Sequence, residues 1–178
     1  MNHRRTLIFF LVLIFAVGAM GTAAANVQFD IGLNVPFLYG ISFQDNDDIQ
    51  KYSEYAFVIP DLKLNYFWGT DTLRIGAGAR AFTAIVETLA IPIVTAELNM
   101  NPLRFTASLG GQAFLLFGIY NNIIFENIFV ADVNAAYKVN DWFHVGAGAT
   151  GLFLGDAELF QETIPYTAYA MVRFSIGD

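Results

Sequence analysis

The sequence contains no cysteine and few charged residues. The missing cysteine excludes a disulfide framework, a thiolate metal site and a lipid anchor attached through cysteine. Charged residues make up only 14% of the 178 residues, well below the roughly one quarter of an ordinary soluble domain. Hydrophobic residues make up 56%, which excludes a disordered chain.

Basic residues are also scarce, because 9 Lys and Arg stand against 16 Asp and Glu and the net charge is −7. Binding to nucleic acid depends on an excess of Lys and Arg that displaces counterions from the phosphates. The sequence therefore predicts no nucleic-acid partner.

Residues 1–25 have the pattern of a cleavable secretory signal peptide. Arg4 and Arg5 precede the apolar run Leu7–Val17, and small alanines follow before the expected cleavage site at Asn26. The alternative is an N-terminal membrane anchor. The run has 11 residues, whereas a spanning helix needs roughly 20, so we favour the signal peptide.

Residues 26–178 alternate between apolar and polar side chains. Between Val27 and Phe37, every second residue is apolar, a period that predicts a strand with one apolar face. About 9 to 11 residues of such a strand, when tilted, cross a bilayer. Seven more stretches follow the same pattern, at 55–68, 73–86, 91–100, 103–115, 128–139, 142–154 and 163–176.

The connections between these stretches alternate in length. Tight turns are predicted at 69–72, 101–102 and 140–141, where Gly, Asn, Asp, Thr and Pro cluster. Longer links are predicted at 44–54, 116–127 and 155–162, and a short one near 87–90. Short turns on one rim and longer loops on the other are typical of an outer-membrane barrel. Both termini lie on the short-turn side, which we expect to face the periplasm.

Ten charged residues in these strands fall on the polar face. An eight-stranded barrel encloses just enough space for side chains, and a Lys or Arg facing lipid at mid-membrane costs about 2–4 kcal/mol. We therefore expect the apolar face to meet lipid and the charges to form a network that plugs the lumen, in preference to an open aqueous pore. The ten are Asp30, Asp61, Lys63, Arg74, Arg80, Glu97, Arg104, Asp132, Lys138 and Arg173.

A membrane helix is the competing interpretation of residues 105–125, which carry no charge and are long enough to span. This stretch begins with alternation, contains paired glycines and paired asparagines, and has no second helix candidate to pack against. We therefore favour strands. The sequence predicts an all-β fold, an eight-stranded antiparallel up-and-down transmembrane β-barrel.

Two predicted hairpins resemble each other. Asp61 and the Arg74–Ala79 segment are matched about 70 residues later by Asp132 and the His144–Ala149 segment. The repeat fits a duplicated half-barrel of four strands. Its inward glycines are expected to leave room for large side chains opposite, such as Tyr169.

This pattern over residues 26–178 resembles the small outer-membrane barrels of the OmpX, OmpW and OmpA-transmembrane type. The resemblance implies a cell outer-membrane location, contact with outer-membrane lipid and with the barrel-assembly machinery, and uses that range from adhesion to the passage of small apolar molecules. We also expect a monomer that needs no cofactor.

His144 is the single histidine after residue 25, and it lies on the polar face. An enzyme of the lipid-modifying barrel type needs a serine and an acid beside its histidine, and no such triad is recognisable. We therefore interpret His144 as a residue lining the lumen and expect no enzymatic activity and no metal ligands.

Acidic residues gather in the predicted outer loops, where only Lys51 opposes them. We hypothesise that this rim attracts divalent cations and, through them, anionic surface lipids. The rim residues are Asp45, Asp47, Asp48, Glu54, Asp156, Glu158 and Glu162, with Glu87 and Glu126 close by.

Two functions remain open from the sequence, and a third is weaker. The first is a structural or surface-interaction barrel without transport. The second is a narrow porin-like channel for small solutes, apolar ones included. The third is a periplasmic ligand-binding barrel, which would be recovered in the soluble periplasm.

Overall fold

The computed structural model of the protein describes residues 26–43, 49–52, 54, 57–84, 87–118, 123–154 and 163–177. The predicted signal peptide, residues 1–25, lies outside the described residues.

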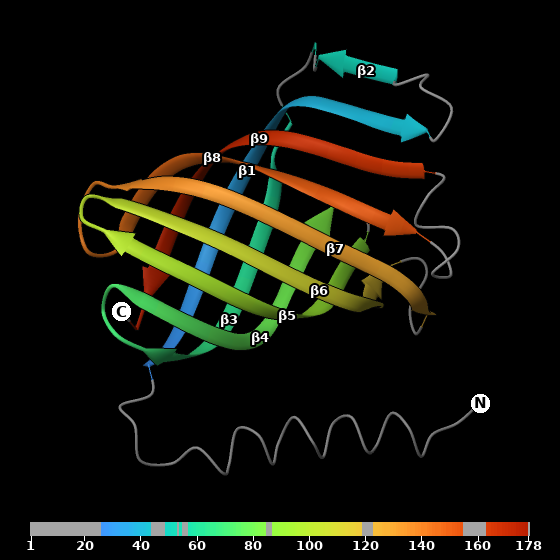
Figure 1. The fold of residues 1–178 in the computed structure, drawn as a ribbon. Helices are drawn as coiled ribbons and strands as arrows, with labels where there is room; N and C mark the ends of the chain where they lie inside the picture. Colours follow the sequence, from blue (N-terminus) through green and yellow to red (C-terminus); the bar gives the residue numbers. More distant parts are fainter. Residues whose placement is uncertain are drawn as a thin grey trace, which may run out of the picture.

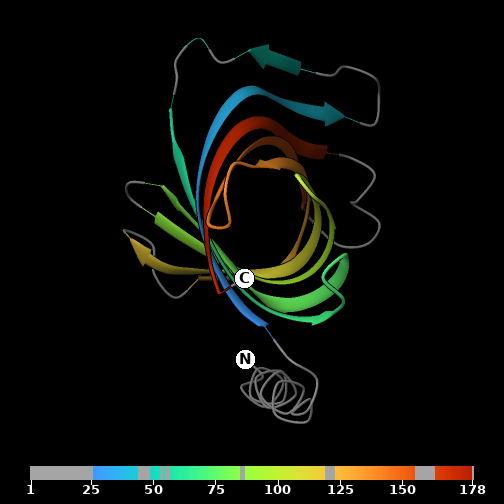
Figure 2. The same cartoon turned by 90° about the vertical axis from the view of Figure 1, so that its left-hand side faces the viewer.

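Eight long antiparallel strands close into a barrel, as the sequence predicts (Figure 1). Each pairs with its neighbour in chain order, and β1 pairs with β9 to complete the ring seen along its axis in Figure 2. A short additional strand, β2, pairs with β1 alone among the described strands. The strands are β1 (Asn26–Phe43), β2 (Ile49–Tyr52), β3 (Ile59–Gly69), β4 (Leu73–Ala84), β5 (Glu87–Met100), β6 (Leu103–Gly118), β7 (Ile123–Lys138), β8 (Phe143–Leu154) and β9 (Thr163–Ile176).

Three tight turns join β3 to β4, β5 to β6 and β7 to β8 at one end of the barrel, which we call the short-turn rim. In the last of these turns the Asn140 Oδ1 accepts hydrogen bonds from the backbone N–H groups of Trp142 at 3.1 Å and Phe143 at 2.8 Å. The first residues of β1 and the last residues of β9 lie at the same rim, because Phe29 pairs with Ile176. We call the opposite end the long-link rim.

Several predicted boundaries were wrong. The predicted short link 87–90 lies inside β5, and most of the predicted link 116–127 belongs to β6 and β7. The predicted loop 44–54 contains β2, and β3 begins at Ile59 instead of near 55. Strands β5, β6 and β7 are therefore longer at the long-link rim than the alternation indicated, whereas β3 is shorter there.

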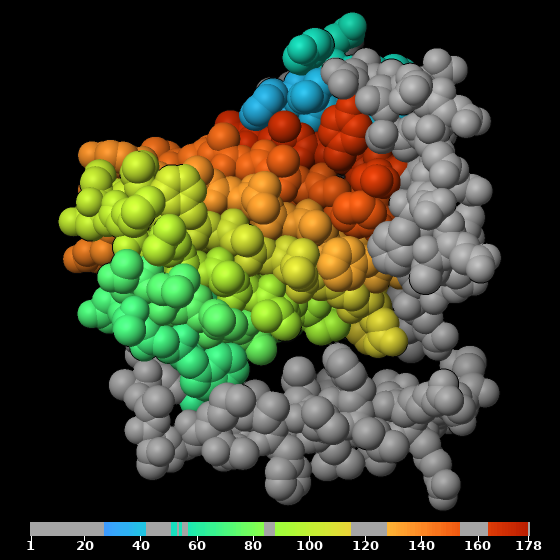
Figure 3. Space-filling model, in the orientation of Figure 1, coloured from blue at the N-terminus to red at the C-terminus, as the bar shows by residue number. Residues whose placement is uncertain are grey.

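The side chains of each strand alternate between the interior and the outer surface, since successive Cβ atoms point to opposite faces. Large apolar side chains stay half-exposed on the outer surface, as at Leu64 (50%), Val94 (57%) and Val133 (57%). Between them, polar and charged side chains point inward and are buried. The wall is continuous across β6 to β9 in Figure 3. The barrel thus inverts the polarity of a soluble protein.

The stretch 105–125 that competed as a membrane helix forms parts of β6 and β7, up to the undescribed residues 119–122. Ser108 pairs with Asp132 and Ala107 with Val133 in this hairpin. Over the described ranges, no helix has the length and apolarity needed to span a membrane.

Strand β1 changes partner halfway along its length. It pairs with β3 from Asn26 to Asn34, and beyond that point with β2 through Leu38 to Ile41. A bulge at Phe37 interrupts its pairing with β9. A bulge bends a strand, and Pro36 beside it has no N–H to donate to a neighbour. The upper part of β1 therefore leaves β3, and Figures 1 and 2 show it diverging with β2.

Candidate functional site

The structure buries nine of the ten charged residues assigned to the lumen from the sequence. Each of the nine is at most 7% exposed. Lys138 differs, because its side chain is 35% exposed and forms an ion pair of 3.0 Å with Asp141 at the short-turn rim. The nine buried residues are Asp30, Asp61, Lys63, Arg74, Arg80, Glu97, Arg104, Asp132 and Arg173.

Four of these residues meet in the middle of the barrel, and we call them the central network: Asp61, Lys63, Arg80 and Asp132. The Arg80 guanidinium donates two hydrogen bonds to the Asp61 carboxylate, at 2.8 and 2.9 Å. Arg80 also pairs with Asp132 at 3.1 Å, and Lys63 pairs with Asp132 at 3.4 Å. Such a bidentate arginine–carboxylate pair is among the stronger hydrogen-bonded arrangements in proteins.

The central network spans the barrel from wall to opposite wall. Asp61 and Lys63 lie on β3, Arg80 on β4 and Asp132 on β7. Three strands separate β3 from β7 in either direction around the ring. The ion pairs between Asp132 and the β3–β4 hairpin therefore cross the lumen.

Neutral side chains satisfy the remaining lone pairs of these carboxylates. The Asp132 Oδ2 accepts hydrogen bonds from the Tyr169 hydroxyl at 2.6 Å and from the Thr150 hydroxyl at 2.7 Å. The Asn134 amide donates to Asp132 Oδ1 at 3.1 Å. Burying a carboxylate is costly unless protein donors replace its hydrogen bonds to water, and at Asp132 these three side chains replace them.

Gly148 makes space for this arrangement. A Cβ atom on Gly148 would lie 2.6 Å from the Tyr169 hydroxyl oxygen and 2.8 Å from the Asn134 Cβ. The expectation that inward glycines accommodate large side chains is confirmed at this position. In the matching hairpin, a Cβ on Gly76 would lie 2.7 Å from the ring of Phe67, which is 2% exposed.

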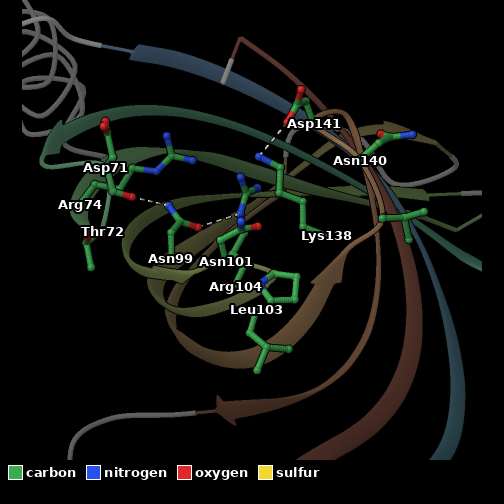
Figure 4. A pocket seen from close by; sticks show the side chains of 12 residues that line it. Asp71, Thr72, Arg74, Asn99, Asn101, Leu103, Arg104, Lys138, Asn140 and Asp141 are labelled. Carbon is green, nitrogen blue, oxygen red and sulfur yellow. Dashed lines mark hydrogen bonds and ion pairs between the residues drawn. The ribbon is translucent and has the colours of Figure 1, made fainter.

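A second group of polar residues lies closer to the short-turn rim, and we call it the rim network: Arg74, Glu97, Asn99 and Arg104. Arg74 pairs with Glu97 at 2.7 Å, and Arg104 pairs with the same carboxylate at 3.4 Å. Arg104 also donates to the Asn99 Oδ1 at 3.1 Å. Figure 4 shows the Arg74, Asn99 and Arg104 side chains converging from β4, β5 and β6.

The rim network continues to β1 and β9. The Arg74 guanidinium donates to the Gln28 Oε1, and the Gln28 amide donates to Asp30 at 2.7 Å. Arg104 reaches the Ser175 hydroxyl at 3.4 Å. The central network and the rim network therefore follow one another along the barrel axis, from the middle of the barrel toward the short-turn rim.

Two cavities lie at opposite ends of these networks. A polar cavity of about 710 Å³ opens at the short-turn rim, where Arg74, Arg104 and Lys138 line it (Figure 4). An apolar pocket of about 560 Å³ lies on the long-link side, lined among others by Phe82 and Ile91. The central network stands between them, since Tyr169 lines the apolar pocket and also hydrogen-bonds Asp132.

The sequence interpretation missed the inward apolar cluster beside this pocket. Ile91, Ile93, Ala113 and Val130 pack together inside the barrel, each at most 6% exposed. A signal was present in the run Ile91–Val94, where alternation is lost and apolar residues occupy both faces. Such a run predicts a strand segment that is apolar on its inner as well as its outer side.

His144 is fully buried inside the barrel, where it pairs in register with Lys138 and Arg173. Of the acidic outer rim, Glu54 is described and exposed, whereas Asp45, Asp47, Asp48, Asp156, Glu158 and Glu162 lie outside the described residues. The hypothesis that the rim attracts cations stays a prediction. No group of three or more His, Asp or Glu side chains placed to hold a metal occurs within the described ranges.

No protein-family model matches the sequence, and no curated protein matches it significantly. Among solved structures, Neisserial surface protein A resembles the chain with a TM-score of 0.48 and 13% identity, over 85% of this chain and 98% of the other. Ail of Yersinia pestis, solved with the heparin analogue sucrose octasulfate, has a TM-score of 0.43 and 11% identity, over 85% and 99%. A designed transmembrane β-barrel has a TM-score of 0.39 and 11% identity, over 84% and 95%. These similarities are distant, and the fold assignment rests on the strand pairing of the chain itself.

Proposed function

We propose that this chain is an integral outer-membrane β-barrel with a closed lumen and a structural or surface-interaction role. The observation that carries the proposal is the inverted polarity of the barrel. Leu64, Val94 and Val133 are half-exposed on the outer surface, whereas Asp61, Arg80 and other charges are buried inside. Water would penalise that arrangement, and a hydrocarbon surround favours it.

The closed lumen is supported by the central network. Its ion pairs join β3 and β4 to β7 across the barrel, and its members are at most 2% exposed. An eight-stranded barrel has an interior just wide enough for side chains or for one small ligand, which leaves no room for an aqueous channel past these ion pairs. We therefore favour a closed barrel over the narrow channel that the sequence left open.

The proposed setting follows from the strand connections. The three short turns, the start of β1 and the end of β9 all lie at one rim. We propose that this rim faces the periplasm, as in bacterial outer-membrane barrels. Residues 1–25 would act as the export signal, and the barrel would be inserted as a monomer by the assembly machinery. We propose no enzymatic role for His144, since its register partners Lys138 and Arg173 do not complete a serine–histidine–acid triad.

Membrane insertion is tested by electrophoresis and extraction. The folded protein is expected to leave membranes only with detergent, and to migrate differently on gels before and after boiling. Recovery in the soluble periplasm would support a periplasmic ligand-binding barrel and contradict the proposal.

Closure of the lumen is tested in planar bilayers. The unmodified protein is expected to give no reproducible conductance. The variant Arg80→Ala with Lys63→Ala, which removes both cations of the central network, is expected to conduct if it folds, and its heat-modifiability checks that it does. Steady conductance of the unmodified protein would favour the channel instead.

A further inference from the structure

The apolar pocket has the size of a small-molecule site. Its volume of about 560 Å³ falls inside the range of roughly 300–1,000 Å³ that ligand pockets occupy. Phe82, Leu89, Ile91, Val130 and Leu152 line it from β4, β5, β7 and β8. Apolar side chains therefore surround it on several walls of the barrel.

The floor of the pocket is closed toward the short-turn rim. Tyr169 and Thr150 line the pocket, and both direct their hydroxyl groups to the Asp132 carboxylate. The Arg80 guanidinium lies 4.2 Å from the centre of the Phe82 ring, which is another lining residue. The charged groups of Asp132 and Arg80 thus interact with residues at the floor of the pocket. The central network closes the pocket at that end.

Each side-chain donor group that lines the pocket donates a hydrogen bond to another group of the protein. Besides Tyr169 and Thr150, the Thr167 hydroxyl donates to the Leu38 carbonyl at 3.2 Å. The Asn34 amide nitrogen donates to Asp61 at 3.3 Å. Only the second N–H of the Asn34 amide is left for a ligand among these side-chain donors, so an ionised carboxylate would meet too few donors to replace its hydration.

Among the lining side chains, the Asn34 amide oxygen is the one polar atom without a hydrogen-bond partner. Asn34 is 4% exposed, and its Oδ1 has no hydrogen-bond partner among the described residues. A buried carbonyl without a donor costs about 1–3 kcal/mol, so a ligand that supplies a donor is favoured. The pocket therefore matches an apolar molecule with one hydroxyl group, whose binding requires the neighbouring side chains to move and uncover the Oδ1, since that atom is closed to solvent in the structure.

The strand pairing of the barrel wall is interrupted on the side of the pocket next to Asn34. The pairing of β1 with β3 ends at Asn34 and Ile59. Phe57 and Val58 continue the pocket lining beyond that point outside any strand, and they are 46% and 53% exposed. Among the described residues, no ladder hydrogen bond joins β1 to β3 beyond this point, so none of them has to break for a molecule to pass.

We propose that the apolar pocket binds a single-chain apolar molecule carrying one hydroxyl group, which enters through the seam between β1 and β3. The hydrocarbon part lies among Phe82, Leu89 and Ile91, and the hydroxyl donates to the Asn34 Oδ1. Because the central network closes the floor, the molecule is held and is not passed on to the other rim.

Photo-crosslinking tests this site directly. The full barrel in phosphatidylcholine nanodiscs is incubated with photoreactive dodecanol, dodecane or ionised dodecanoate, and labelled residues are mapped by mass spectrometry. Dodecanol is expected to label pocket-lining residues. Dodecane lacks the hydroxyl group and is expected to label them about fivefold less, because one neutral hydrogen bond changes the affinity by about that factor. Dodecanoate is expected to label them least. A photoreactive phosphatidylcholine, which tests a membrane lipid tail as the source, is expected to label only the outer surface.

Three variants make the test specific. Leu89→Trp fills the pocket and is expected to abolish its labelling, whereas Val94→Trp on the outer face of the same strand should leave it unchanged. Asn34→Leu should make dodecanol and dodecane label equally. Heat-modifiability verifies that each variant folds.

The proposal is overturned by any of three results. These are dodecanol labelling confined to the outer surface, pocket labelling that survives Leu89→Trp, and phosphatidylcholine labelling of the pocket that dodecanol does not displace. Equal labelling by dodecanol and dodecane in the unmodified barrel would overturn the role of Asn34.

Discussion

At the scale of single residues, Arg80 forms shorter ion pairs with both carboxylates of the central network than Lys63 does. It holds Asp61 through two hydrogen bonds and Asp132 through a third contact. Without Arg80, two carboxylates on different strands would share only Lys63. Arg80 is therefore the side chain that offsets part of the cost of burying both carboxylates at once.

We expect Arg80→Leu to lower the free energy of unfolding by about 3–5 kcal/mol, because it leaves buried carboxylates with too few partners. Lys138→Leu is the control, since Lys138 and Asp141 form an exposed pair worth about 0–1 kcal/mol. Urea unfolding in lipid vesicles, followed by tyrosine and tryptophan fluorescence, measures both. Equal effects of the two changes would show that the central network does not stabilise the barrel.

Gly148 gives a second prediction at this scale. Gly148→Ala places a Cβ against the Tyr169 hydroxyl and should cost about 1–3 kcal/mol through overpacking. Gly151→Ala on the same strand is the control, because its Cβ would meet nothing closer than 3.5 Å. The same unfolding measurement compares them. Equal stability of the two variants would show that the Tyr169 hydroxyl does not need the space that Gly148 leaves.

The sequence predicted which charges point inward because the side-chain period of two assigns each residue to a face. It did not predict which charges pair, because contacts such as Asp132 with Arg80 cross the barrel and depend on its closure. Lys138 was assigned to the lumen by parity alone. Because Lys138 is the last residue of β7, its amine reaches Asp141 in the following turn.

At the scale of the strands, the outer face of β7 is predicted to depend on membrane depth. Val133→Arg, in the middle of the strand, should cost about 2–4 kcal/mol. Val139→Arg, just beyond the strand at the short-turn rim, should cost about 0–1 kcal/mol. Unfolding in vesicles measures both. A cost that is the same at both depths would contradict a spanning β7.

The divergence of β1 from β3 was not predictable from alternation. The pattern ended at Phe37 because the bulge there shifts the parity of the residues that follow. Strand β2 was read as loop, since Gln50 and Lys51 are polar and the strand is short. Its place is set by the upper part of β1, which turns away from β3 and leaves an edge for pairing.

At the scale of the whole molecule, the eight-stranded closure followed from the number of alternating stretches and the tight turns between them. The internal repeat holds for the glycines of β4 and β8, since Gly78 lies opposite Asn65 and Gly148 lies opposite Asn134. In that register Asp132 is equivalent to Lys63 and not to Asp61, although both carboxylates bind Arg80 in the middle of the barrel. The two halves of the barrel are therefore joined by ion pairs that the repeat does not predict.

The central claim is that the apolar outer face meets hydrocarbon, and spin labelling tests it most directly. The chain has no cysteine, so single cysteines at Leu64, Val94, Leu109 and Val133 can each carry a spin label. In lipid vesicles, the account predicts that each label is readily reached by molecular oxygen and poorly by a water-soluble nickel chelate. Ready access of the nickel chelate to these four positions would contradict it.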